Sequence, residues 1–359
     1  MNTIAGDAIR SSLLDKHAYI CDLINIEGPL LSLFRDNRSN WCYLWCDTDG
    51  KDTERWAVIY VLRSTLAGYL NQQTSLRDLL NTSSTIYCLD ITTKIEDGAR
   101  VRHRRLKRVN VSALEQYWPA EDSFFDPSLT EDISLTQEIT PTRYHVPIDG
   151  EWFISDLDRF ARTYDSVYAF FYCTKPRFVT NIQDKVHRLL RSPWTGGFSR
   201  INLFDALGRT IPSIHDTKIN KFTYASPGSI QIEGLRSVGD NVSNAIRRHV
   251  ANHVEIAAAV KAINVCFISN KVRKADLSSK SDAVLSIAQE SVALLKAKCQ
   301  EIAQLLDIED ELAVFVLNAP NTVVAAKATL ALVTQLEKLA GYQQCGMLDL
   351  ARAVPDDEM

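Results

Sequence analysis

The feature that most constrains the fold is a regular stripe of apolar residues in the last third of the chain. Its members recur at alternating steps of three and four residues: Leu285, Ala288, Val292, Leu295, Cys299, Ile302 and Leu306. Side chains at this spacing lie along one side of an α-helix, so the stripe predicts a long helix that packs lengthwise against a partner. Two more segments with long apolar stripes, near 240–264 and 321–340, predict helices that supply such a partner within the chain.

A second copy of the chain is the alternative partner, because a stripe of about three heptads suffices for packing within or between chains. We therefore expect a helical bundle whose remaining surface binds a protein partner or a second copy. The candidate residues for this helix packing or oligomer contact are Leu285, Val292, Leu295, Ile302 and Leu306.

The first part of the chain has a different periodicity. Segments 30–34, 41–46 and 55–61 are dense in aromatic and β-branched residues, and turn-forming residues separate them. This pattern predicts a three-stranded meander. In the middle segment, Trp41, Tyr43 and Trp45 alternate with Cys42, Leu44 and Cys46, so both faces of the strand are apolar. We expect a central strand that is covered on both sides.

The predicted fold class is α+β. A chain of 359 residues can bury two or three cores. We expect an N-terminal antiparallel β-rich domain at 1–114, an acidic, proline-containing linker at 115–150, a mixed α/β region at 151–235 and a C-terminal α-helical bundle at 236–352.

Composition indicates a globular protein of the cytosol. Hydrophobic residues make up 46% and charged residues 23% of the chain, which is ordinary for soluble domains. The N-terminus lacks the apolar core of a signal peptide, and no apolar run reaches the roughly eighteen residues that cross a bilayer. We expect a cytoplasmic protein with no membrane contact, whose eight scattered cysteines stay free thiols.

A cluster of basic residues is a candidate nucleic-acid site. The segment 100–108 carries six cationic side chains: Arg100, Arg102, Arg104, Arg105, Lys107 and Arg108. On a strand, Arg100, Arg102 and Arg104 would share one face, at a spacing suited to a phosphate backbone. The alternative is intramolecular, because the acidic segment that follows could neutralise the cluster. Because the formal net charge of the whole chain is −4, any electrostatic attraction to nucleic acid must come from a local cluster of cations such as this one.

Two histidines are a candidate metal site. His249 and His253 lie four residues apart in a segment that reads as one helix, which would place both rings on one face. The helical zinc motif needs a glutamate directly after the first histidine, and Val250 stands there instead. We expect the pair to lie beside the apolar stripe, at the boundary with solvent.

Motifs that hold common cofactors are missing. Neither glycine-containing stretch, 194–199 or 226–234, ends in Gly-Lys-Ser/Thr, and no Gly-x-Ser-x-Gly elbow occurs. The segment 47–54 resembles a calcium loop, but its Gly50 is fourth rather than sixth, which favours a hairpin turn. We therefore expect no cofactor.

Residues 27–90 resemble the opening domain of a bacterial family known only as a domain of unknown function. The resemblance rests on Gly28-Pro29, the tryptophan-rich strands and Ser75-Leu76-Arg77-Asp78. It implies a prokaryotic cytosolic protein, and it identifies no activity and no functional residue. Such genes often lie in mobile or antiviral islands.

The sequence thus predicts a non-catalytic binding or assembly component, such as an accessory subunit of a bacterial antiviral defence or toxin–antitoxin module. A nucleic-acid-binding protein that uses residues 100–108 is one alternative. A metal-dependent hydrolase centred on His249 and His253 is the other.

Overall fold

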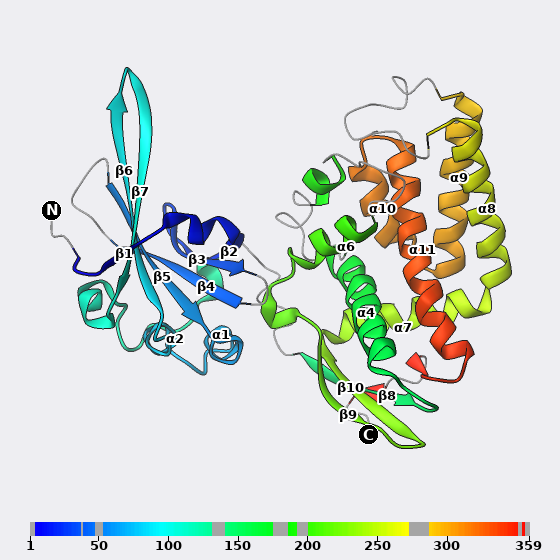
Figure 1. Ribbon diagram of the computed structural model, residues 1–359, viewed down its shortest axis with the longest axis horizontal. Coiled ribbons are helices and arrows are strands. Elements are labelled where there is room, and N and C mark those ends of the chain that lie inside the picture. Colours follow the sequence, from blue (N-terminus) through cyan, green and yellow to red (C-terminus); the bar gives the residue numbers. More distant parts are fainter. Residues whose placement is uncertain are drawn as a thin grey trace. The chain divides into compact units, whose positions relative to one another are not determined.

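The computed structural model describes residues 4–36, 39–46, 53–130, 141–174, 186–191, 200–272, 287–350 and 354–355. The chain divides into two compact units (Figure 1). The first comprises Met1–Thr140 with Pro212–Ile214, and the second comprises Pro141–Ile211 with His215–Met359. An antiparallel sheet forms most of the first unit and helices dominate the second, so the predicted α+β class is confirmed.

The first unit is built on a seven-stranded antiparallel sheet in the order β1-β7-β6-β5-β4-β3-β2. The strands are β1 (Asp7–Ile9), β2 (Ala18–Asn25), β3 (Pro29–Asp36), β4 (Ser39–Cys46), β5 (Thr53–Val61), β6 (Ile86–Glu96) and β7 (Ala99–Val109). The predicted meander is confirmed as β3, β4 and β5. Strand β2 extends the meander on one side, and β6, β7 and β1 extend it on the other.

A long hairpin joins β6 to β7. Asp97 and Gly98 form its turn, and both have a positive φ, as the tightest hairpin turns require. The two strands pair without a shift from Ile86↔Val109 to Glu96↔Ala99, whereas β5 pairs with β6 only up to Thr92. The far half of the hairpin therefore projects as a two-stranded ribbon (Figure 1).

One face of this sheet is buried beneath helices and a folded loop. The cover consists of α1 (Arg63–Leu70), α2 (Leu76–Asn81) and three short 3-10 helices, η2 (Val111–Ala113), η3 (Glu115–Tyr117) and η4 (Pro127–Leu129). Phe125 packs against Tyr69, and the Trp118 indole donates to Asn81 Oδ1 at 2.6 Å. Residues 115–130, which we expected to belong to a linker, are therefore part of this unit, because their apolar side chains complete its core.

The second unit joins a small sheet to seven named helices. Its strands, in the order β11-β8-β10-β9, are β8 (Thr142–Ile148), β9 (Lys218–Thr223), β10 (Gly228–Gly234) and β11 (Val354–Pro355). The helices are α4 (Ile154–Thr174), α6 (Arg200–Gly208), α7 (Arg236–Ala251), α8 (His253–Ser269), α9 (Gln289–Leu306), α10 (Glu309–Asn318) and α11 (Thr322–Gln344). One apolar core runs through both, so the predicted mixed region and bundle form a single unit.

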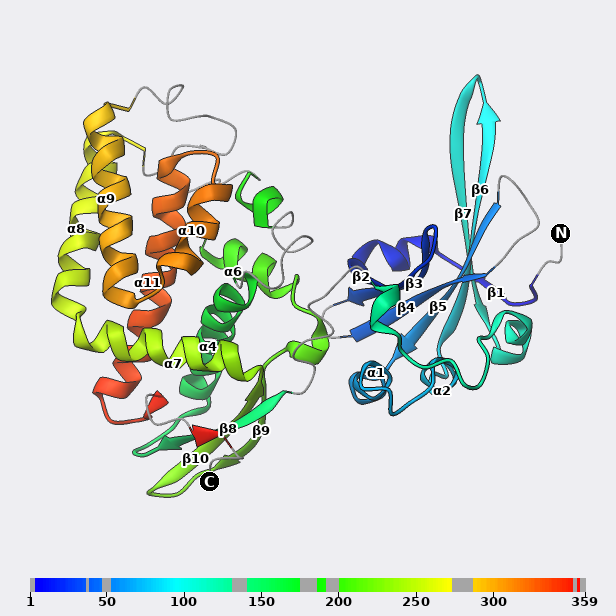
Figure 2. The ribbon, with the colours of Figure 1, turned by 180° about the vertical axis from the view of Figure 1, so that it is seen from behind.

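The apolar stripe of the last third is used inside this unit. Leu295, Ile302 and Leu306 of α9 are buried and Val292 is half-buried, while Leu285 lies outside the described residues. Helix α9 packs against α7, α8 and α11, and it stands between α8 and α11 in both views (Figures 1 and 2). The apolar stripe of α9 therefore packs against other helices of the same chain, which is one of the two predicted alternatives.

Two boundaries of the predicted helices were wrong. The segment near 240–264 is not one helix, because α7 ends before Asn252 and α8 continues at 88° to it. The last helix, predicted near 321–340, ends at Gln344, and Asn321 caps its start by accepting from the Val324 N–H at 2.9 Å. By length and composition, no described helix could cross a membrane alone, though α7 and α8 pass together as a bent pair.

Candidate nucleic-acid interface

The register of the hairpin sorts the six basic residues between the two faces of the first unit's sheet. Leu106 and Leu89 are a cross-strand pair on the face opposite the helices, so alternate residues of β7 lie with them. Arg100, Arg102, Arg104 and Arg108 therefore share this face, which we call the open face. Arg105 and Lys107 lie on the helix-covered face. The predicted sharing of one face by Arg100, Arg102 and Arg104 is confirmed.

The open face also carries most of the unit's aromatic side chains. The cross-strand pairs Phe34↔Trp41, Tyr43↔Val58, Trp45↔Trp56 and Trp56↔Leu89 place them there. The Phe34 and Tyr43 rings stack with centroids 4.1 Å apart, and those of Trp45 and Trp56 meet edge to face at 5.0 Å. Trp41, Trp45 and Trp56 are only half-buried, so the expectation that β4 is fully covered on both sides was wrong.

A cavity of about 610 Å³ crosses this open face. Its floor includes Tyr43 and Trp56, and Arg104 lies on its lining. The 3-10 helix η1 (Ser11–Lys16) forms one wall, and His17, which follows that helix, accepts or donates a hydrogen bond with the Tyr43 hydroxyl at 3.0 Å. Burial lowers the pKa of His17 against the opposing pull of Asp36. The cavity thus combines aromatic surface, a neutral imidazole, a guanidinium and the side chains of Asp15 and Asp22.

The basic cluster is only partly neutralised within the protein. Arg102 Nη2 lies 3.3 Å from Glu54 Oε1 in a solvent-exposed ion pair. Such exposed pairs contribute little to the free energy of folding. No described carboxylate lies within ion-pair distance of the remaining arginines of the segment: Arg100, Arg104, Arg105 and Arg108. The following acidic segment does not serve as their counter-charge where it is described, since its Glu121 approaches Arg77 instead. Residues 131–140 of that segment lie outside the described part.

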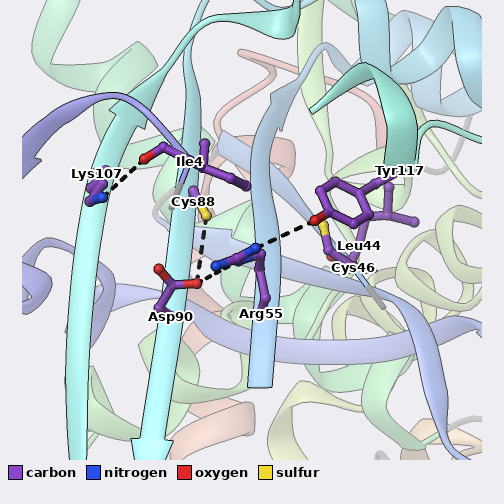
Figure 3. Close-up of polar contacts among 8 residues, drawn as sticks. All are labelled: Ile4, Leu44, Cys46, Arg55, Cys88, Asp90, Lys107 and Tyr117. Carbon is purple, nitrogen blue, oxygen red and sulfur yellow. Dashed lines mark hydrogen bonds and ion pairs between the residues drawn. The ribbon is translucent and has the colours of Figure 1, made fainter. Parts of the chain in front are cut away.

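The helix-covered face holds a structural polar cluster (Figure 3). Arg55 donates to Asp90 Oδ1 at 2.6 Å and to the Tyr117 hydroxyl at 3.4 Å, so it ties η3 to β5 and β6. Lys107 donates to the Ile4 carbonyl at 2.9 Å. This contact holds Ile4 against β7. Because its ammonium group is used there, Lys107 is not part of the candidate interface.

The cysteines beside this cluster are poor nucleophiles. Burial raises the pKa of Cys46 to about 12 and that of Cys88, which also feels the Asp90 carboxylate, to about 11. The thiol of Cys88 donates to Asp90, and that of Cys46 to the Leu44 carbonyl (Figure 3). All eight cysteines are free, as expected, and seven of them are buried.

The histidine pair lies in the second unit and does not form the expected arrangement. His249 is in the last turn of α7 and is 6% exposed, whereas His253 is the exposed first residue of α8. The bend at Asn252 removes them from a common helical face. Across the described ranges, no group of three or more His, Cys, Asp or Glu side chains is placed to hold a metal ion. Most of the calcium-like stretch, residues 47–52, lies outside the described residues.

Comparison of the chain with protein-family models, with curated proteins and with solved structures found no match. The resemblance of residues 27–90 to a bacterial family of unknown function stays a prediction.

Proposed function

We propose that the protein is a non-catalytic binding component whose N-terminal sheet holds single-stranded nucleic acid across its open face. One observation carries the proposal: the strand register gathers Arg100, Arg102, Arg104 and Arg108 on the same face as three tryptophans. Guanidinium groups bind phosphates, and aromatic rings stack on bases, contributing roughly 1–3 kcal/mol per base. The arginines lie on β7 and the tryptophans on β4 and β5, and strand β6 separates the two groups in the sheet.

The geometry favours a single strand over a duplex. The rings of Tyr43 and Trp56 lie on the floor of a cavity that η1 bounds on one side. Bases reach such a floor only when they are unpaired, whereas a duplex presents its phosphates and keeps its bases stacked inside. The formal charge of −4 makes this face, and not the whole chain, the source of attraction.

The test is the fluorescence anisotropy of labelled single-stranded DNA and RNA of mixed sequence, with the matching duplexes as controls. We expect single strands to bind more tightly than duplexes and to quench tryptophan fluorescence. The logarithm of the affinity should fall with the logarithm of salt by about 0.7 per neutralised phosphate. Equal binding of strand and duplex without quenching would contradict the proposal, and so would no binding at low salt.

Self-association is a second proposal, because helix α8 leaves apolar side chains uncovered. Val254, Val265 and Ile268 are 62%, 54% and 61% exposed. The stripe on α9 is used inside the unit, so these α8 residues replace it as the candidate contact. Light scattering of the purified protein at tens of micromolar tests this, and a strict monomer would reject it.

A further inference from the structure

A second cavity, of about 490 Å³, lies in the second unit between α8 and α11. The two helices run in opposite directions on either side of α9 (Figures 1 and 2), and residues from the first turn of α8 and from the last turns of α11 line the same cavity. Val260 and Val333 give the cavity apolar walls, and His249 closes it at the end of α7. Its size and mixed lining are those of a site for a small organic molecule.

His249 is the buried polar group of this cavity. Its Nδ1 is enclosed and has no hydrogen-bond partner. Burial lowers the pKa of this imidazole, with Glu337 opposing and His253 reinforcing the shift, so the ring is neutral at pH 7. A buried N–H without an acceptor is costly, which favours the tautomer with its proton on Nε2. His249 then offers one N–H donor.

Charges of both signs line the same cavity. Lys261 of α8 and Glu337 of α11 are exposed, as is His253. Within the described ranges, no ion pair joins Lys261 to Glu337, and neither pairs with another side chain. A cation and an anion that face one cavity without satisfying each other are complementary to a ligand that carries both charges.

We propose that this cavity binds a small zwitterion with an apolar body, of the chemical class of an apolar α-amino acid. The ligand ammonium pairs with the Glu337 carboxylate, and the ligand carboxylate pairs with the Lys261 ammonium. The apolar side chain of the ligand packs between Val260 and Val333, and His249 donates to a ligand oxygen. This site is in a different unit from the open face and does not depend on nucleic-acid binding.

Calorimetric titration of the full chain with L-leucine and two matched analogues tests the proposal. The analogue 4-methylpentanoate lacks the ammonium, and 3-methylbutylamine lacks the carboxylate. We expect saturable binding of L-leucine and at least about tenfold weaker binding of each analogue, since each loses one charged contact. L-serine, which keeps both charges but lacks the apolar body, should also bind weakly.

Two substitutions assign the charges. Lys261→Met should lower the affinity for L-leucine to that of 3-methylbutylamine, and Glu337→Gln should lower it to that of 4-methylpentanoate. Lys338→Met is the control, because Lys338 is exposed on α11 but does not line the cavity. The proposal is overturned if no apolar amino acid binds up to about 10 mM, or if L-leucine and both analogues bind equally.

Discussion

At the scale of single residues, alternation along β7 separates charges that are available to a ligand from charges that serve the fold. Arg104 lies on the open face and lines its cavity, while Lys107 is held by the Ile4 carbonyl on the other face. Arg105, between them in sequence, faces the same side as Asp90. Of the six basic side chains in residues 100–108, four thus belong to the candidate interface.

The Arg55–Asp90 pair should contribute strongly to stability. Both side chains are largely enclosed, at 9% and 18% exposure, so removing one charge leaves the other poorly compensated. We expect Asp90→Asn to lower the free energy of unfolding by about 3 kcal/mol in urea titration. Glu54→Gln breaks the exposed pair with Arg102 and should lower the free energy of unfolding by less than about 1 kcal/mol. Equal effects of the two substitutions would contradict this account.

Alkylation should distinguish the cysteines. Only the thiolate reacts, and the raised pKa of Cys46 and Cys88 keeps both thiols protonated until the pH approaches 11 to 12. Cys345 is exposed, so the reagent reaches its sulfur directly. We expect iodoacetamide at pH 8 to modify Cys345 first, as read by peptide mass spectrometry. Early modification of Cys46 or Cys88 in the folded protein would show that the sheet opens in this region.

The two histidines show why their site could not be predicted from sequence. The four-residue spacing was correct, but a common helical face also requires an unbroken helix. Asn252 ends α7, and its side chain donates to the Leu305 carbonyl at 2.7 Å, a contact with a residue more than fifty positions away. Glu337, which acts electrostatically on His249, comes from another helix. Only the packing of three helices brings these groups together.

At the scale of elements, adjacent residues of α9 provide a matched pair. Leu295 is fully buried, whereas Leu294 is 40% exposed. We expect Leu295→Ala to destabilise the protein by about 2–5 kcal/mol through lost packing and a residual cavity. Leu294→Ala should change the free energy of unfolding by less than about 1 kcal/mol. The measurement is denaturant unfolding followed by circular dichroism, and similar effects at both positions would contradict the assigned helix face.

The hairpin turn should control the projecting ribbon. Gly98 has φ +80°, a conformation that β-branched residues avoid, so Gly98→Val should disturb the turn and speed hydrogen exchange in residues 93–102. Asp97→Asn keeps a turn-compatible pair and should leave exchange unchanged. Protection that survives Gly98→Val would mean that pairing along the strands, and not the turn, fixes the ribbon.

Periodicity predicted most of the individual elements and little of their assembly. The meander of β3 to β5 and the helix α9 follow from local patterns. The hairpin was not predicted although Asp97-Gly98 signals it, because residues 100–108 were considered as a strand without a partner strand. Without the hairpin, the aromatic residues of β4 and β5 could not be placed beside Arg104.

At the scale of the whole molecule, the formal net charge of −4 opposes nonspecific attraction to nucleic acid. Binding must then depend on where the cations lie and not on how many there are. Arg104 and Arg105 are adjacent and both exposed, and they lie on opposite faces of one sheet. Reversing either charge changes the net charge equally, so a difference between the two variants reports the face alone.

The most direct measurement compares Arg104→Glu with Arg105→Glu in the titration of one labelled single strand at fixed salt. Both variants should first show wild-type unfolding. Arg104→Glu should weaken binding by about tenfold or more, and Arg105→Glu should stay within about twofold of the wild type. If the two variants bind equally well, or if Arg105→Glu is the weaker, the open face is not the interface.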